Sequence, residues 1–260
     1  MDDFLQTFFD WRQIVSALPS LLTEGMRNTL LIAFLAIVFG LVGGMLLAVL
    51  LLSRYRFVRL PARVYVDVFR GLPAIVTVSL VGIGLPAAGL RLFGRAPLGY
   101  AVLAIGLISA AYCAEIFRSG IQAVPPGQLQ AGRALGMFYL QTMRLVVVPQ
   151  GVRNVLPALT GQFIVDVKES ALVYLLGLAV GQRELYFIAQ EQQAASYNSS
   201  PLVAAGMCYL VITIPLTYLV NWMDRRLRQD GPRRGRPGSA PPPGPVATLR
   251  ATDNVAGVQR

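Results

Sequence analysis

Long stretches without a charged residue constrain this chain more than any other feature. No charged residue occurs between Arg27 and Arg54, and the stretch is rich in Leu, Ala, Val and Gly. About 20 apolar residues are enough for a helix to cross the hydrocarbon core of a bilayer. The sequence therefore predicts an all-α integral membrane protein with about five transmembrane helices. The predicted spans are about 28–52, 71–91, 96–115, 155–180 and 201–223.

Composition supports a membrane protein and argues against a nucleic-acid-binding protein. Hydrophobic residues make up 55% of the chain and charged residues only 14%, which is too little polar surface for a soluble domain. The formal net charge is +10, but the arginines lie in loops and in the C-terminal tail, and no basic stripe alternates with aromatic residues. We therefore expect membrane lipid, and no nucleic acid, as a partner.

The distribution of arginines predicts the orientation. Cytoplasmic loops carry an excess of Lys and Arg, and here the arginines gather after the first span, between the third and fourth, and after the fifth. These are Arg54, Arg56, Arg59 and Arg63, then Arg118, Arg133, Arg144 and Arg153, then Arg225, Arg226 and Arg228. The N-terminus is thus predicted outside and the C-terminus in the cytoplasm. Residues 1–24 are predicted to be an extracytoplasmic amphipathic segment, and residues 229–260, rich in Pro, Gly and Arg, a disordered cytoplasmic tail.

Little in the sequence points to an enzyme. The chain has no histidine, which excludes His-based acid–base catalysis and metal sites that use histidine. It also lacks the Gly-x-x-x-x-Gly-Lys-Ser/Thr loop that binds nucleotide phosphates. Cys113 and Cys208 lie in hydrophobic stretches, where buried thiols are more usual than a disulfide. We predict no catalytic residue, no metal and no cofactor.

A polar segment, 127–150, interrupts the hydrophobic sequence and carries a spaced motif. Gln130, Ala131 and Gly132 are followed after three residues by Gly136, and after nine more by a Val-x-Val-Pro stretch that ends at Pro149. The pattern resembles the EAA loop of bacterial ABC-importer permeases: Glu-Ala-Ala, three residues, Gly, nine residues, Ile-x-Leu-Pro. On spacing alone, an ordinary helix-turn-helix between two spans is the alternative.

The flanking sequence resembles the polar amino acid branch of these permeases. The similar segments are 69–73, 114–125, 133–136 and 159–172, and the resemblance covers about residues 20–228. It implies a type I ABC importer transmembrane domain over 25–228, in a multi-pass protein of the bacterial inner membrane. It also implies four kinds of partner: cytoplasmic ABC ATPases that hydrolyse the ATP, a second permease subunit, identical or homologous, an extracytoplasmic solute-binding protein and an amino acid substrate.

The resemblance also implies which residues couple to the ATPase. They are Gln130, Ala131, Gly132, Arg133, Ala134, Leu135, Gly136 and Pro149. Two of them depart from the family pattern. Gln130 replaces the usual Glu, which removes a charged contact. Gly132 replaces the usual Ala, which weakens a helix there by up to about 1 kcal/mol.

Ionisable residues inside the fourth predicted span indicate a substrate path. At 100° per residue Gln162, Asp166 and Glu169 lie on one stripe, whereas Lys168 points away from it. Charged groups at this depth cost about 2.5 to 3.5 kcal/mol each and usually face a partner or a water-filled path. The alternative is that they lie near the membrane surface, paired with arginines or packed against the second subunit. Arg70, at the mouth of the second span, is the other candidate.

A secondary transporter driven by an ion gradient is the competing functional class. It predicts inverted repeats and an ion site at the bilayer midplane. No convincing repeat relates the two halves of the sequence. The motif at 130–149 therefore favours the ABC importer permease.

Overall fold

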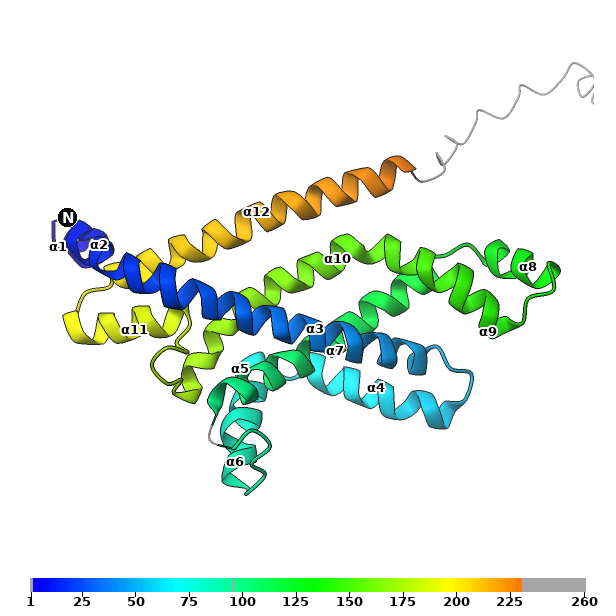
Figure 1. Cartoon of the computed structure of the whole chain (residues 1–260), viewed down its shortest axis with the longest axis horizontal. Coiled ribbons are helices and arrows are strands. Elements are labelled where there is room, and N and C mark those ends of the chain that lie inside the picture. Colours follow the sequence, from blue (N-terminus) through cyan, green and yellow to red (C-terminus); the bar gives the residue numbers. More distant parts are fainter. Residues whose placement is uncertain (1, 95, 231–260) are drawn as a thin grey trace, which may run out of the picture. The chain divides into compact units, whose positions relative to one another are not determined.

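The computed structural model describes residues 2–94 and 96–230, and every regular element in those ranges is helical (Figure 1). The chain divides into two units, Met1–Asp224 and Arg225–Arg260. The tail predicted over 229–260 lies outside the described residues from 231 onward. The helices are α1 (Asp2–Phe9), α2 (Trp11–Ser20), α3 (Met26–Leu51), α4 (Arg56–Gly71), α5 (Ala74–Ser79), α6 (Leu85–Ala87), α7 (Pro97–Gln122), α8 (Pro126–Ala134), α9 (Tyr139–Thr142), α10 (Val148–Glu169), α11 (Leu185–Ser196) and α12 (Ser200–Asp230).

Irregular helical turns join several of these helices. Three are π-helical: η1 (Leu21–Gly25) before α3, η2 (Leu80–Gly84) between α5 and α6, and η3 (Met143–Val147) before α10. The fourth, η4 (Ser170–Leu176), is a 3-10 segment that follows α10. The all-α fold class predicted from the sequence is confirmed.

Within the described residues, three helical stretches are long and apolar enough to cross a membrane. The first is Phe4–Leu51, which contains α3; the second is α7; the third is Ser200–Leu227, which is most of α12. A fourth results if α4 and the helix Ala74–Ala87, bent by 107° at the break between them, are one span. The predicted span 155–180 falls on α10 and η4. Helix α10 carries Arg153 and three charged residues near its end, and it is not among the helices that are apolar enough to count as a span. The arrangement of five spans remains a prediction.

Helix α7 is the element on which α3, α4 and α10 pack, and small residues make the closest contact. A Cβ added to Gly44 of α3 would lie 2.5 Å from Cβ of Cys113 and 2.9 Å from the backbone nitrogen of Ala114, both on α7. Gly40, one turn earlier, lies equally close to Ser109. Small residues allow such close approach of membrane helices, which is how they associate without a hydrophobic driving force.

Between Ala33 and Ala48 the two sides of α3 differ in residue size. Apart from Ile37, the buried residues of this stretch are Gly and Ala, whereas the exposed side carries large apolar residues, among them Phe34, Val42 and Leu46. A helix that is apolar all round is expected where one face meets protein and the other meets lipid. We infer that the large side chains of α3 face the acyl chains.

A side chain at Gly44 should weaken this packing. We expect Gly44→Leu to lower the stability of the fold by about 1 to 3 kcal/mol, the usual result of overpacking a tight contact. Gly206→Leu in α12 is the matched control, because a Cβ there meets nothing within 4 Å. Thermal unfolding of both variants in one detergent makes the comparison, and equal midpoints would contradict the assigned contact.

Loop 177–184 is held against the start of α3 by buried and half-buried polar groups. The side-chain amide of Asn28 donates to the carbonyl oxygens of Gly181 at 3.1 Å and Arg183 at 3.0 Å. The Glu24 carboxylate accepts from the backbone nitrogens of the same two residues. Polar groups of the loop backbone are thereby satisfied where the chain passes close to the bundle.

Glu184 ends this loop and is fully buried. It caps α11, because its carboxylate accepts from the backbone nitrogens of Tyr186 and Phe187, each at 2.6 Å, and it also accepts from the Tyr209 hydroxyl at 3.0 Å. Burial raises the pKa of Glu184 from 4.5 to about 7, an effect that the three hydrogen bonds oppose. The folded state therefore binds the proton more tightly than the unfolded state does.

The sign of the pH effect follows from this raised pKa. The stabilisation from protonated Glu184 is fully present below about pH 4.5 and is lost as the pH rises to about 7. Glu184→Gln, which stays neutral, should therefore show a smaller fall of the unfolding midpoint over that interval than the wild-type protein. Glu191→Gln is the control, because the Glu191 carboxylate is on the same helix but is exposed and paired with Arg183. This variant should show the same fall of the unfolding midpoint with pH as the wild-type protein. Identical pH profiles for wild type and Glu184→Gln would refute the assignment.

Candidate functional site

The segment 127–150 folds into a short helical hairpin of α8 and α9. Helix α8 ends in a Schellman motif, in which the backbone nitrogen of Gly136 donates to the Arg133 carbonyl at 3.0 Å and that of Met137 to the Gly132 carbonyl at 3.2 Å. Gly136 has φ +84°, and a Cβ there would meet nothing within 4 Å. The backbone conformation, rather than lack of space, is therefore what this glycine provides.

Gly132 has a different role, which explains why it departs from the family pattern. It is buried, and a Cβ at this position would collide with the Thr142 side chain of α9. Thr142 is itself fully buried, and its hydroxyl donates to the Phe138 carbonyl at 3.1 Å. The Gly lets α9 approach α8 more closely than the usual Ala would permit.

The hairpin rests on a small core and presents an apolar surface. Ile121, Val124 and Val147 form the buried core beneath it and connect it to the end of α7. Leu135, Phe138 and Leu140 are 84%, 81% and 77% exposed. Seven of the eight predicted coupling residues are exposed, and Gly132 is the buried one. Exposed apolar side chains that are surrounded by polar residues are typical of protein–protein contact sites.

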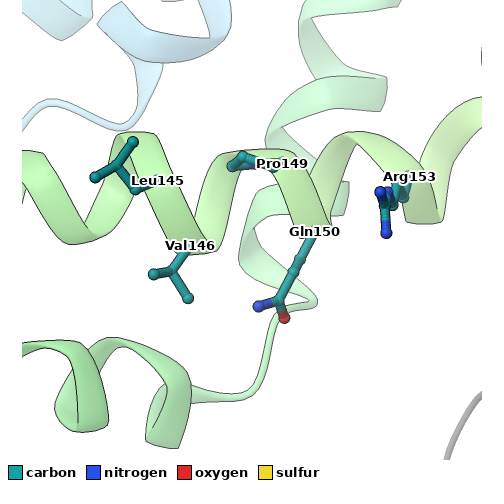
Figure 2. A pocket seen from close by; sticks show the side chains of 5 residues that line it. All are labelled: Leu145, Val146, Pro149, Gln150 and Arg153. Carbon is teal, nitrogen blue, oxygen red and sulfur yellow. The ribbon is translucent and has the colours of Figure 1, made fainter.

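Two hollows lie beside this surface. One, of about 340 Å³, is lined by residues of η3 and the start of α10: Leu145, Val146, Pro149, Gln150 and Arg153 (Figure 2). The other, of about 420 Å³, is lined by Phe138, Leu140, Gln141, Arg144 and Leu145. Each hollow is lined by apolar side chains and one arginine, Arg153 in the first and Arg144 in the second. Such a lining suits a partner that contributes an apolar side chain and an acidic group.

Asp166 of α10 lies in a polar cluster that joins α10 to α7. It is fully buried, and its carboxylate accepts from the Ser109 hydroxyl at 2.8 Å and from the Gln162 side-chain amide at 2.9 Å. The sequence placed Gln162 and Asp166 on one stripe, and the structure brings them into direct contact. Ser109 was missed, because a single hydroxyl in an uncharged stretch gives no signal about a partner 57 residues away.

The other candidates for the substrate path form no hydrogen bond to this cluster in the described residues. Glu169 is half-buried, and its Oε2 is a buried atom with no hydrogen-bond partner in the described chain. Lys168 is exposed and forms no ion pair with either carboxylate in the described ranges. Arg70, also exposed, lies with its guanidinium carbon 5.4 Å from the centre of the Tyr112 ring. Glu169 therefore has an unused acceptor, whereas both oxygens of Asp166 already have donors.

Within the described residues, no group of three or more His, Cys, Asp or Glu side chains is arranged to hold a metal ion. A buried carboxylate with two hydrogen-bond donors stabilises the contact between two helices. A half-buried carboxylate that pairs with no cation of the described chain, as Glu169 is, carries a charge that attracts cationic groups.

Comparison with known proteins identifies the family. Residues 36–229 match the family described as binding-protein-dependent transport system inner membrane component. The chain belongs to this family. It is therefore a multi-pass protein of the inner membrane, as the sequence predicted, and the family assignment favours the importer over the ion-gradient transporter.

Individual relatives match most of this chain and nearly all of their own length. The chain is 36% identical over 223 residues to the glutamate/aspartate import permease protein GltK of Escherichia coli O6:H1, with 84% of this chain and 98% of the relative covered. It is 35% identical over 222 residues to the arginine transport system permease protein ArtQ of Bacillus subtilis, with 85% and 98% covered. A solved structure, "Crystal structure of an amino acid ABC transporter with histidines", matches with TM-score 0.74 and 35% identity over 84% of this chain and 98% of that one. The predicted fold of an ABC importer membrane domain is confirmed.

Proposed function

We propose that this chain is the permease subunit of an ATP-driven importer for a polar amino acid, and that the α8–α9 hairpin couples it to a separate cytoplasmic ATPase. The relatives named above, which import glutamate and aspartate or transport arginine, support the substrate class. The observation that carries the coupling role is the hairpin itself, with its Schellman cap at Gly136 and its exposed Leu135, Phe138 and Leu140.

The position of the hairpin in the chain suits a coupling role. Helix α8 begins four residues after α7 ends, and α9 leads through η3 directly into α10. A displacement of the hairpin therefore acts on both helices of the Ser109–Asp166 contact. A partner that binds one arrangement of these helices more tightly shifts the population toward it, and near-complete conversion needs roughly 5 kcal/mol of differential binding.

The complete transporter contains further subunits in this proposal. Two permease subunits, identical or homologous, enclose the path, two ATPases bind the hairpins, and an extracytoplasmic binding protein delivers the amino acid. Exposed Gln130 on α8 keeps the hydrogen-bonding capacity of the family's Glu without its charge. We propose that half-buried Glu169 lies beside the path and that its charge favours cationic amino acids over anionic ones.

Changing the Schellman glycine should uncouple the transporter. In Gly136→Val, a β-branched residue must adopt a positive φ, which costs of order 1 to 3 kcal/mol and distorts the hairpin. ATP-dependent uptake and co-purification of the ATPase should both fall, with membrane insertion unchanged. Gly127→Val is the matched control, because Gly127 lies in the same hairpin with no positive φ and with open space around its Cα. Normal uptake and ATPase binding in Gly136→Val would refute the coupling role.

Neutralising Glu169 should change transport, whereas neutralising Asp166 should change stability. We expect Glu169→Gln to reduce uptake of arginine about tenfold or more relative to glutamine, since one charge contact of about 1.5 to 3 kcal/mol is lost. Asp166→Asn, which alters the buried Ser109 contact, should instead lower the unfolding midpoint, as should Ser109→Ala. Radiolabelled uptake into proteoliposomes and thermal unfolding give the two readings. A parallel decrease for both amino acids in Glu169→Gln would exclude a role in charge selection.

A further inference from the structure

Helices α1 and α2 expose large apolar side chains that the transport function does not use. On α1, Phe4 and Phe9 are 59% and 52% exposed, and the Phe4 and Phe8 rings lie 5.0 Å apart. On α2, Trp11 is 70% exposed. Such a concentration of exposed aromatic rings on two adjacent short helices calls for an apolar environment.

Exposed apolar residues of α2 and the turn after it form a stripe that is separate from the buried side of the helix. Trp11 and Val15 of α2 and Leu22 of η1 are exposed and fall within about 40° of one another at helical spacing. A neighbouring face of α2, with Ile14 and Ala17, packs into a core formed with α11 and α12. Packing against the bundle therefore determines which way the stripe points.

Hydrogen bonds attach α1 and α2 to the first residues of α12. The backbone nitrogen of Asp10 donates to the Ser200 hydroxyl at 2.9 Å, and that of Ser199 donates to the Thr7 carbonyl at 2.9 Å. The Asn198 side-chain amide donates to the Gln6 carbonyl at 2.8 Å. Because Ser200 begins α12, α1 and α2 lie at one end of a helix that is long and apolar enough to span the membrane.

Helix α3 is long enough to cross the hydrocarbon core without α1 and α2. Its 26 residues extend about 39 Å at 1.5 Å per residue, more than the roughly 30 Å of the core. Helix α3 therefore needs no residue of α1 or α2 to cross. Trp and Tyr side chains are enriched at the membrane–water interface, where the ring contacts acyl chains and its polar edge contacts headgroups. Arg12, exposed next to Trp11, supplies a cation for lipid phosphates.

We propose that α1 and α2 lie in the membrane interface at the level where α12 begins, with Trp11 and its stripe inserted at the boundary between phospholipid headgroups and acyl chains. The occupant of this surface is lipid. An interfacial helix of this type holds its apolar face at a shallow depth and does not cross the bilayer. The proposal goes beyond the transport function and holds whichever amino acid is carried.

The chain contains two tryptophans, Trp11 and Trp222, which makes a direct measurement possible. The full-length chain carrying Trp222→Phe, reconstituted in phospholipid nanodiscs, reports fluorescence from Trp11 alone. Spin-labelled lipids then quench it, with the label at the headgroup, at the top of the acyl chain or at its end. We expect quenching by the first two labels to be at least about twofold stronger than by the third, with little quenching by aqueous iodide. Trp11→Phe, which reports Trp222, is the control for quencher incorporation.

Each other outcome overturns the proposal. Strong quenching by iodide without quenching by lipid would place Trp11 in water. Strongest quenching by the label at the chain end would place α2 inside the hydrocarbon core. Absence of quenching by any of the probes would show that protein, such as a second copy of the chain, covers the stripe.

Discussion

The close packing of α3 on α7 is the contact on which the rest of this structure depends. A lipid environment offers no hydrophobic gain for bringing two apolar helices together, so association rests on van der Waals contact at short range. Gly40 and Gly44 allow this close contact, because neither has a side chain where Ser109 and Cys113 of α7 lie. Helix α7 thereby becomes the shared support for α3, α4 and α10.

The same helix connects the two candidate functional regions. Ser109, which lies under Gly40, also donates to Asp166 on α10, so the tight helix contact and the buried carboxylate share one side chain. Further along, α7 ends at the small core beneath the α8–α9 hairpin. A movement of the hairpin relative to α7 therefore has a short physical route to α10, through packed residues and one hydrogen-bond cluster.

Local sequence predicted the features that depend on local chemistry. The uncharged stretches predicted α3, α7 and α12, and the motif spacing singled out Gly136, which has φ +84° in the structure. Features that depend on contacts between distant residues could not be predicted. The clash that Gly132 avoids is with Thr142, and the partners of Glu184 include Tyr209 in another helix. The end of α10 at Glu169 is likewise not encoded by the spacing of apolar residues.

A permease that alternates between two shapes needs rigid parts joined at a few places that bend, and the irregular turns of this chain occur at such places. The π-turn η3 lies between the hairpin and α10, and η2 interrupts the helix that follows the 107° break. Turns of this kind loosen the regular hydrogen-bond ladder and are frequent at functional positions. The Schellman cap and the Gly132–Thr142 contact make the hairpin itself stiff, whereas η3 gives it a junction to α10 that can adjust. In the coupling proposed above, a stiff hairpin and an adjustable η3 let a force applied at the hairpin surface change the angle of α10 rather than deform the hairpin.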